Sequence, residues 1–420
     1  MNLRLTPWAL ATALTALLLL NGSLLPATEP AKSAEWPEFH GPNRDNISTE
    51  KGLLKKWPEG GPRLVWKYSP CGVGYAGVAI ADGMIFTSGD FGEEEIVFAL
   101  DMDGKPVWKS PNGASWQQAT PGSRTTPTYH QGMLYHMNPT GRLAALDAKT
   151  GKPRWTVDLQ GEFGARFGTW ALAENVVVEG DRVLCLPGGS KGFAVALDKN
   201  TGKTIWANTE FKERAAYCSP VLATHQGTRL LVTLAERSVV GIDVKTGKLL
   251  WSHPFGKVWQ NTTSPVVHDG QVFITCGHSS GGQLLKINPD GRGLSEVWYR
   301  KDFDNCHGGV ILLDGTLYGC GCRLGGKAFF AIDFLTGKTK YTNKTLGKIS
   351  ITYADGMLYC VSNTGQMLLL AITPEGCNLV SQFNLPRESK DESLCHPVVC
   401  GGRLYMRHDQ NLYVYDVRTK

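Results

Sequence analysis

One pattern of apolar and polar positions recurs along the whole chain. Two apolar residues precede an aspartate, a Thr-Gly-Lys or Asp-Gly-Lys turn follows, and two residues later the repeat ends in an aromatic residue. The clearest copies end at Trp108, Trp155, Trp206 and Trp251. Looser copies end at Trp298, Tyr341 and Phe383. Counted from Trp66, the intervals between these aromatic residues are 42, 47, 51, 45, 47, 43 and 42 residues, which indicates a tandem repeat.

Each repeat also contains an earlier turn that is followed by apolar and aromatic residues. Examples are Asp82-Gly83 before Met84-Ile85-Phe86, and Asp314-Gly315 before Thr316-Leu317-Tyr318. An Asp-Gly pair between two short apolar runs predicts a β-hairpin, because the turn requires a positive φ. The Thr-Gly-Lys turn predicts a second hairpin. Two hairpins in each repeat give four antiparallel strands, which make one propeller blade.

The two ends of the chain set the number of blades. The last repeat reaches Asp416 without a strand of the Gly-Lys-x-x-Trp type, and residues 63–67 form such a strand with no partner before it. We therefore predict that residues 63–420 form an all-β, eight-bladed β-propeller of four-stranded antiparallel blades, closed by this N-terminal strand. The aromatic residues that end the repeats are expected to pack between blades, because each buries a large apolar area. Residues 34–62 remain as an N-terminal extended segment.

Residues 1–33 have the pattern of a signal peptide. Arg4 supplies a positive charge, residues 8–20 carry no charge, and small residues that suit cleavage occur at 25–27 and 31–33. A run of this length is shorter than the about 20 residues that cross a bilayer. No cysteine that could carry a lipid occurs before Cys71. We expect a periplasmic or secreted protein, soluble after removal of the signal peptide and without a membrane span.

Composition and charge narrow the function classes. The chain has 43 Lys and Arg against 38 Asp and Glu, 19% of its residues are charged, and no block of five like charges occurs. This argues against a disordered chain and against a nucleic-acid-binding protein, which needs a clustered basic face. The eleven cysteines are an odd number. Cys185, Cys276, Cys320 and Cys360 lie in predicted strands, where we expect them to be small buried apolar residues.

The Ala-x-Asp-x-x-Thr-Gly-Lys-x-x-Trp signature resembles the tryptophan-docking repeat of pyrroloquinoline quinone (PQQ) type propellers. That family includes quinoprotein alcohol dehydrogenases, which carry PQQ and Ca²⁺ on the propeller axis, and non-enzymatic outer-membrane assembly factors of the BamB type. The opening segment from Trp36 to Arg44 is similar to the start of uncharacterised secreted bacterial members. The resemblance covers nearly the whole chain after the signal peptide and implies the fold. It does not by itself assign a chemistry.

Residues that precede the innermost strands are expected to ring one mouth of the central channel. Aligned on the turn glycines, they are Arg124, Trp170, Glu174, Tyr217, Cys218, Trp259, Asn261, Asp304, Cys306, His307, Cys395 and His396. The quinoprotein resemblance implies that Glu174 and Asn261 could hold Ca²⁺ and that Trp259 could stack on the cofactor. It further implies that Arg124 could bind a cofactor carboxylate and that Asp304 could be the general base. A metal shared by the two Cys-His pairs, 306–307 and 395–396, is a further alternative.

Two functions remain open from the sequence. The first is an exported binding or scaffold module that holds a protein, a glycan or a small ligand at the channel mouth, with no cofactor. The alternative is a PQQ- and Ca²⁺-dependent alcohol or sugar dehydrogenase. The chain lacks the pair of adjacent cysteines typical of those enzymes and has no C-x-x-C-H haem motif, which favours the binding module. We do not expect the protein to bind nucleic acids.

The signal-peptide hypothesis predicts the mass of the exported protein. Cleavage between about residues 27 and 34 should remove the charged start and the apolar run, because signal peptidase cuts after small residues. Intact-mass spectrometry of the protein recovered outside the cytoplasm would measure the new N-terminus. Recovery of a form that still contains residues 1–20 would contradict the hypothesis.

Overall fold

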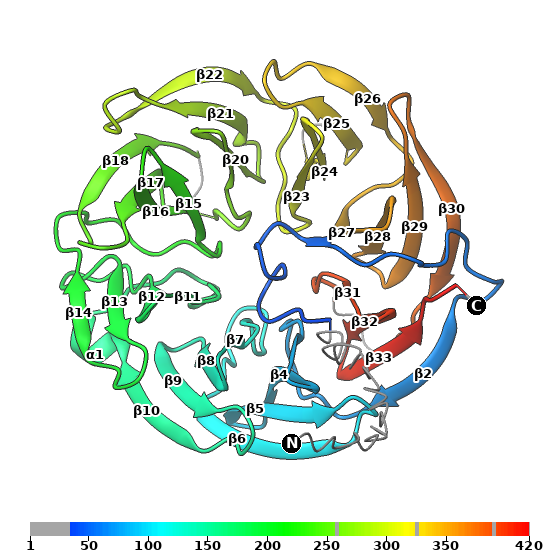
Figure 1. The fold of residues 1–420 in the computed structure, drawn as a ribbon, viewed down its shortest axis with the longest axis horizontal. Coiled ribbons are helices and arrows are strands. Elements are labelled where there is room, and N and C mark those ends of the chain that lie inside the picture. The colour runs from blue at the N-terminus through cyan, green and yellow to red at the C-terminus, as the bar shows by residue number, and fades with distance from the viewer. Residues whose placement is uncertain (1–33, 257–259, 324–326, 389–391, 420) are drawn as a thin grey trace, which may run out of the picture. The chain divides into compact units, whose positions relative to one another are not determined.

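The computed structural model describes residues 34–256, 260–323, 327–388 and 392–419. They belong to the larger of two compact units, Ser33–Lys420. Residues 1–33, with the predicted signal peptide, lie outside the described part. Within the larger unit, eight antiparallel sheets surround one axis, as Figure 1 shows. This confirms the predicted eight-bladed β-propeller.

Blades 1 to 4 each consist of four consecutive strands. Their bounds are β3 (Ala79–Ala81), β4 (Met84–Phe91), β5 (Glu94–Asp101) and β6 (Pro106–Ala114); β7 (Thr128–His130), β8 (Met133–Met137), β9 (Arg142–Asp147) and β10 (Pro153–Asp158); β11 (Val177–Glu179), β12 (Arg182–Cys185), β13 (Val195–Asp198) and β14 (Thr204–Ala207); β15 (Val221–His225), β16 (Thr228–Leu234), β17 (Ser238–Asp243) and β18 (Leu249–Pro254). One short helix, α1 (Leu159–Phe163), follows β10. No helix in the described part is long and apolar enough to cross a membrane.

Blades 5 to 8 continue the same order around the ring. Their bounds are β19 (Val266–His268), β20 (Gln271–Cys276), β21 (Gly281–Ile287) and β22 (Leu294–Arg300); β23 (Val310–Leu313), β24 (Thr316–Cys320), β25 (Phe329–Asp333) and β26 (Thr339–Asn343); β27 (Ile349–Ala354), β28 (Met357–Ser362), β29 (Gln366–Ile372) and β30 (Cys377–Asn384); β31 (Val398–Cys400), β32 (Arg403–His408) and β33 (Asn411–Asp416) with β2 (Arg63–Tyr68). The two-residue strand β1 (Ile47–Ser48) pairs in parallel with β27 and adds a fifth strand to blade 7.

The eighth blade combines both ends of the propeller. Strand β2 pairs antiparallel with β33, and Lys67 lies opposite Tyr413. The indole N–H of Trp66, on β2, donates to the main-chain oxygen of Met102 in blade 1 at 3.0 Å. The predicted closure through the N-terminal strand is therefore confirmed.

The predicted turns have the backbone that their sequence requires. Asp82 and Gly83 have φ values of 49° and 70°, and Asp314 and Gly315 have 47° and 69°. Two successive residues with positive φ form the turn that matches the twist of a two-residue hairpin. The strands that follow bury their apolar residues between neighbouring blades.

Most neighbouring blades are joined by an aromatic residue that packs against a glycine of the next blade. The indole N–H of Trp108 donates to the main-chain oxygen of Ala148 at 2.9 Å. A Cβ atom added to Gly151 in the same turn would lie 2.4 Å from the Trp108 ring. The same arrangement joins Trp66 with Gly104, Trp155 with Gly202, Trp206 with Gly247 and Trp298 with Gly337.

Three junctions depart from this arrangement. At the closing blade, Phe383 replaces tryptophan and packs against Gly61, where a Cβ atom would lie 2.7 Å from the ring. Trp251 is 3% exposed, and its indole nitrogen has no hydrogen-bond partner in the described part. The Tyr341 hydroxyl is likewise buried without a described partner. In the turns of the next blades, a Cβ atom added to Gly291 or Gly376 would meet nothing within 4 Å, so the Trp251 and Tyr341 junctions lack the glycine contact.

Two glycine substitutions measure what the contact between an aromatic ring and the turn glycine of the next blade contributes to stability. Gly151 and Gly83 both have a φ of 70°, but a Cβ atom at Gly83 would meet nothing within 4 Å. Gly83→Ala should cost roughly 1 kcal/mol, the strain of a left-handed residue. Gly151→Ala should cost about 2 kcal/mol more, because its methyl group also displaces the Trp108 ring. Urea unfolding measures the free energy of unfolding of both variants. Equal losses of stability would show that the contact with Trp108 does not contribute.

Candidate functional site

A cavity of about 810 Å³ lies on the propeller axis. Its wall comes from the segments that lead into the innermost strands of seven blades, all except blade 7. The residues from these segments include Tyr75, Thr120, Arg124, Trp170, Asn175, Tyr217, Ser219, Gln260, Thr262, His307, Glu392, Cys395 and His396. The repeat places the same kind of residue at the same point of successive blades, so these side chains converge on one space.

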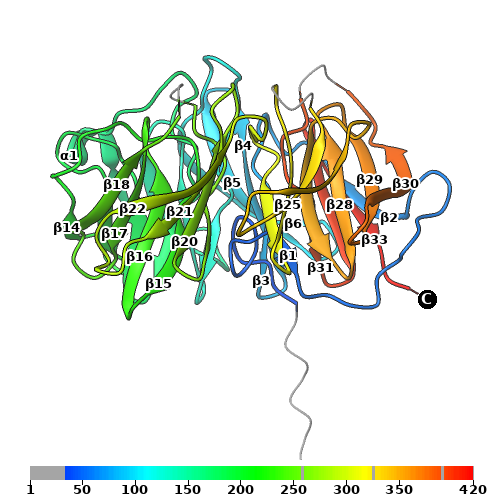
Figure 2. The ribbon, with the colours of Figure 1, turned by 90° about the horizontal axis from the view of Figure 1, so that it is seen from above.

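The N-terminal segment forms the floor of this cavity. We name residues 36–46 the strap. Trp36, Phe39, His40 and Asn46 line the cavity from the strap. In Figure 1 the strap is the dark-blue chain at the centre, and Figure 2 shows it at the face beside β1 and β3. The strap is a feature that the sequence analysis did not predict.

Hydrogen bonds to several blades hold the strap in place. Trp36 exchanges two main-chain hydrogen bonds of 2.8 Å with Ile80 in blade 1. The Arg44 guanidinium donates to the main-chain oxygens of Asn175 at 3.2 Å and Pro220 at 3.1 Å. The Asn46 amide bonds the Nδ1 atom of His396 at 2.8 Å. The strap therefore ties together blades that are far apart in the sequence.

Arg124 lies in the wall among aromatic rings. Its Nε atom donates to the main-chain oxygen of Trp170 at 2.7 Å, and Nη2 donates to that of Ala119 at 3.0 Å. The guanidinium carbon lies 6.0 Å from the centre of the Trp116 ring. Burial lowers the pKa of Arg124, with nearby Tyr75 and acidic groups acting in the opposite direction. Trp170 contacts the Tyr217 ring edge to face at 5.7 Å.

Glu174 is buried and does not line the cavity. Its side chain is 2% exposed, and Oε1 accepts a hydrogen bond of 2.5 Å from the Leu186 N–H. Oε2 is buried without a partner in the described part. Burial raises the pKa of Glu174 to about 8, against a smaller opposite effect of Arg44. At neutral pH this carboxyl group is therefore mostly protonated.

Asn261 is also turned toward the protein interior. Its Nδ2 atom donates to the main-chain oxygens of Ala235 at 2.7 Å and Glu236 at 3.3 Å. Its own carbonyl oxygen accepts from the Tyr217 N–H at 2.9 Å. Oδ1 is buried without a described partner. Asn261 thus supports the loop before β15 and is not part of the cavity wall.

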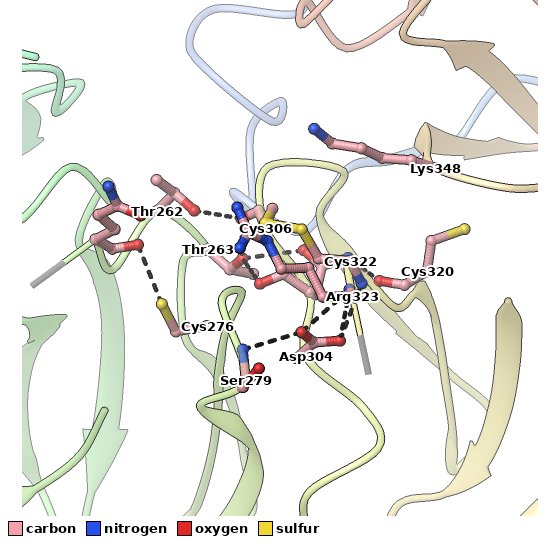
Figure 3. Close-up of a disulfide and its surroundings, with 12 residues drawn as sticks. Thr262, Thr263, Cys276, Ser279, Asp304, Cys306, Cys320, Cys322, Arg323 and Lys348 are labelled. Carbon is pink, nitrogen blue, oxygen red and sulfur yellow. Dashed lines mark hydrogen bonds between the residues drawn. A yellow bond between two sulfur atoms is a disulfide. The ribbon is translucent and has the colours of Figure 1, made fainter. Parts of the chain in front are cut away.

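Asp304 connects two loops (Figure 3) and is not among the residues that line the cavity. Oδ2 accepts from the Ser279 N–H at 3.1 Å, and Oδ1 accepts from the Cys322 N–H at 3.0 Å. The Arg323 N–H reaches both oxygens at 3.2 Å. Ser279 has a φ of 72°. Because a serine rarely adopts this backbone, the carboxylate stabilises a strained turn next to His278, which lines the cavity.

A disulfide joins Cys306 to Cys322 beside Asp304 (Figure 3). The sequence analysis did not predict it. The bond leaves Cys306 without a free thiolate, so the two Cys-His pairs cannot share a metal through all four side chains. Within the described ranges, no group of three or more His, Cys, Asp or Glu is placed to hold a metal ion. The nine other cysteines are free and buried, which confirms the prediction for the strand cysteines.

Seven residues of the predicted ring line the cavity, and they are Arg124, Trp170, Tyr217, Cys306, His307, Cys395 and His396. Of the four described residues to which the quinoprotein resemblance gave a role, one lies in the wall and three lie outside it. Arg124 lines the cavity, whereas Glu174, Asn261 and Asp304 do not. Trp259 lies outside the described residues. The sequence analysis missed Tyr75, His278 and the strap residues. The dense aromatic, proline and glycine content of 36–42 was a signal for the strap, but nothing in it indicated which blades it would meet.

A family model described as "Outer membrane protein assembly factor BamB" matches residues 93–321, more than half of the chain. The chain belongs to this family. BamB of Salmonella typhimurium is 27% identical over 207 residues, which are 48% of this chain and 47% of that protein. The quinohemoprotein alcohol dehydrogenase ADH-IIG of Pseudomonas putida is 30% identical over 135 residues, 30% of this chain and 18% of the enzyme. The chain thus matches less than half of the length of either curated relative.

Solved structures of BamB-family and quinoprotein propellers share the fold. BamB from Moraxella catarrhalis has a TM-score of 0.60 at 18% identity, covering 85% of this chain and 98% of that one. Quinohemoprotein alcohol dehydrogenase from Comamonas testosteroni has a TM-score of 0.64 at 13% identity, covering 92% of this chain and 81% of the enzyme. At these identities the likeness shows the propeller alone.

The buried carboxyl group of Glu174 predicts a pH-dependent stability. Its pKa rises from 4.5 in the unfolded chain to about 8, so the wild type should lose about 1.4 kcal/mol of unfolding free energy per pH unit between these values. Glu174→Gln avoids this loss. It should match the wild type near pH 4 and be more stable by on the order of 3 kcal/mol near pH 7.

Urea unfolding at several pH values tests this, with the exposed Glu210→Gln as control. A wild type that is the more stable protein near pH 7 but not near pH 4 would contradict the raised pKa and mean that Glu174 is ionised in the folded protein.

Proposed function

We propose that this chain is an exported, BamB-like binding module whose axial cavity holds a small organic anion. The observation that carries this proposal is the position of Arg124 in the wall, next to the rings of Trp170 and Trp116. A guanidinium held by main-chain oxygens keeps a fixed orientation, and its remaining N–H groups suit a carboxylate or phosphate.

The charges around the cavity support an anionic ligand. Besides Arg124, the wall contains four histidines, which are His40, His278, His307 and His396. Burial lowers the pKa of each, so at neutral pH they add hydrogen-bonding groups and Arg124 supplies the positive charge. Glu392 is the one carboxylate among the described lining residues. It accepts from the Asn363 amide at 3.1 Å and lies 3.7 Å from the Lys348 ammonium, so its charge is compensated. The space is therefore biased toward negative ligands.

The size and lining of the cavity support a small ligand. A volume of about 810 Å³ falls in the usual range for organic ligands. Several wall polar groups already have protein partners. Asn175 Nδ2 donates to Ser219 Oγ at 2.8 Å, and the hydroxyls of Thr262 and Thr263 donate to the main-chain oxygen of Cys306. With these groups satisfied, the aromatic faces and Arg124 remain to bind the ligand.

The dehydrogenase is the second candidate, and its residues fit poorly. Similarity to quinoprotein alcohol dehydrogenases and the Arg124 site favour it. Ca²⁺ takes six to eight oxygen ligands. Glu174 and Asn261 each have one buried side-chain oxygen without a described partner, but neither residue lines the cavity. Both side-chain oxygens of Asp304 accept hydrogen bonds from main-chain N–H groups. The described residues therefore do not form a site for Ca²⁺ and PQQ at this cavity.

Calorimetric titration of the mature protein tests the proposal. The probes are aromatic carboxylates, their uncharged amides, and PQQ with and without Ca²⁺. Carboxylates should bind at least about tenfold more tightly than the amides, since a charge-assisted hydrogen bond to Arg124 contributes roughly 1.5 to 3 kcal/mol. Arg124→Gln should remove this preference, and the exposed Arg154→Gln should keep it.

Other outcomes of the titration assign the function differently. No binding by any carboxylate would overturn the small-anion proposal and leave a protein or glycan at the mouth. PQQ binding that requires Ca²⁺ and is lost in Glu174→Gln and Asn261→Ala would favour the dehydrogenase. Alcohol oxidation with an artificial electron acceptor, lost in Asp304→Asn, would establish it.

A further inference from the structure

The strap holds an unusual density of strained backbone. His40, Arg44 and Asn46 have φ values of 66°, 56° and 63°, and Gly41 has 81°. Residues other than glycine rarely adopt this left-handed region, and each costs about 1 to 2 kcal/mol unless it is an asparagine or aspartate. Such strain persists only where surrounding contacts hold it. The strap is therefore a segment that would relax if its contacts weakened.

The strap also separates two cavities. A second cavity of about 210 Å³ is lined by Asn43, Arg44 and Asp45 of the strap and by residues of blades 4 to 6. Four residues line both cavities, and they are His40, Thr263, Ser264 and Gly309. A partition shared by so few residues is thin. Movement of His40 would join the two spaces into one.

The contacts of the strap are strong at its ends and weak at its middle. Trp36 is fixed to Ile80, and Arg44 is fixed to main-chain oxygens of two blades. Between them, His40 stacks on Phe39 at 3.7 Å and lies 4.6 Å from the His396 ring. The Nε2 atom of His40 is buried without a hydrogen-bond partner in the described part. The side chain of His40 thus has ring contacts at the partition, while its main-chain oxygen accepts from the Asn46 N–H at 2.9 Å.

The groups that face this pair of histidines are positive or neutral. His40 faces His396 and Arg44. The main-chain oxygen of His307 lies 2.9 Å from Nε2 of His396, and His307 in turn faces Lys348 and His278. Three nearby carboxylates are engaged elsewhere: Glu38 with Arg44, Glu392 with Lys348, and Asp45 with the Ile47 N–H at 3.0 Å. In the described part, histidines within ion-pair distance of a carboxylate are His136 and His408, both away from the strap.

We propose that the strap is a pH-sensitive floor: protonation of the His40–His396 pair lifts its middle and joins the two cavities. Two positive rings at this distance, beside Arg44 and without a carboxylate, repel one another. The anchors at Trp36 and Arg44 remain, so the opening is local. The strained backbone between them relaxes as the floor opens.

The direction of the effect follows from the imidazole groups. Burial lowers the pKa of His40 well below 6.5, and burial also lowers the pKa of His396. The seated strap therefore binds fewer protons than the lifted one. Its stability is fully present above about pH 6.5 and falls as the pH drops below this value. Each imidazole shifts the equilibrium by up to about tenfold per pH unit in this window.

The consequence for ligands rests on the proposed function. If the cavity binds an anion, acidification would enlarge it and add positive charge to its floor. The opening itself needs no ligand. It can therefore be tested separately, and failure of either proposal leaves the other standing.

Hydrogen exchange in the ligand-free full chain measures the opening. The main-chain N–H groups of Gly41, Arg44 and Asn46 are bonded within the strap, to Glu38, Gly41 and His40. Their protection, corrected for the intrinsic exchange rate, should fall at least about tenfold between pH 7 and pH 5. The central strands of the blades should stay protected. Unchanged strap protection, or an equal fall in the blades, would overturn the proposal.

Substitutions assign the effect to the histidines. His40→Asn removes the charge, and asparagine tolerates the left-handed backbone at this position, so the fall in protection should disappear. His396→Gln should act in the same way while keeping a polar partner for Asn46. His253→Asn, on the outermost strand β18, should behave like the wild type. His40→Arg should already have low strap protection at pH 7. A pH-dependent fall that survives in both His40→Asn and His396→Gln would overturn the proposal.

Discussion

The contact between an aromatic ring and the turn glycine of the next blade is the interaction on which this propeller depends. A tryptophan that buries 150 to 250 Å² contributes on the order of 5 kcal/mol gross, and its indole N–H satisfies a main-chain oxygen of the neighbouring blade. Six of the eight junctions use this contact, five with tryptophan and one with Phe383 on Gly61. Each contact holds two neighbouring blades together, and the N-terminal segment supplies Trp66 and Gly61 to the blade that closes the ring.

This explains why the fold could be predicted from the sequence. The tryptophan, the turn glycine and the aspartate that bonds the turn all lie within one repeat, so their spacing is visible without a structure. Asp147, for example, accepts hydrogen bonds from the N–H and hydroxyl of Thr150 in its own turn. The unpaired strand at 63–67 was equally visible, because a missing strand at one end matched an extra strand at the other.

The candidate site could be predicted only in part, and the reason is the direction of each side chain. The repeat placed Arg124, Glu174, Asn261 and Asp304 before innermost strands, and they lie there. Arg124 reaches the cavity, whereas the other three turn inward to satisfy main-chain groups such as the N–H of Leu186 and Cys322. A sequence gives the position of a residue along the chain. It does not show which loop will lie beside the side chain and donate a hydrogen bond to it.

The strap shows why family membership leaves the chemistry of the cavity open. The family model covers residues 93–321, which contain the docking tryptophans from Trp108 to Trp298 but neither the strap nor His396. The match to the family model therefore reflects the repeat residues that form the blades. The same repeat residues account for the similarity to both BamB and the quinoprotein enzymes. The floor of the cavity is built by contacts more than 300 residues apart, such as that of Asn46 with His396. Arg124 and the strap line the cavity, whereas the tryptophans that define the repeat pack between the blades, so the repeat carries no information about a ligand.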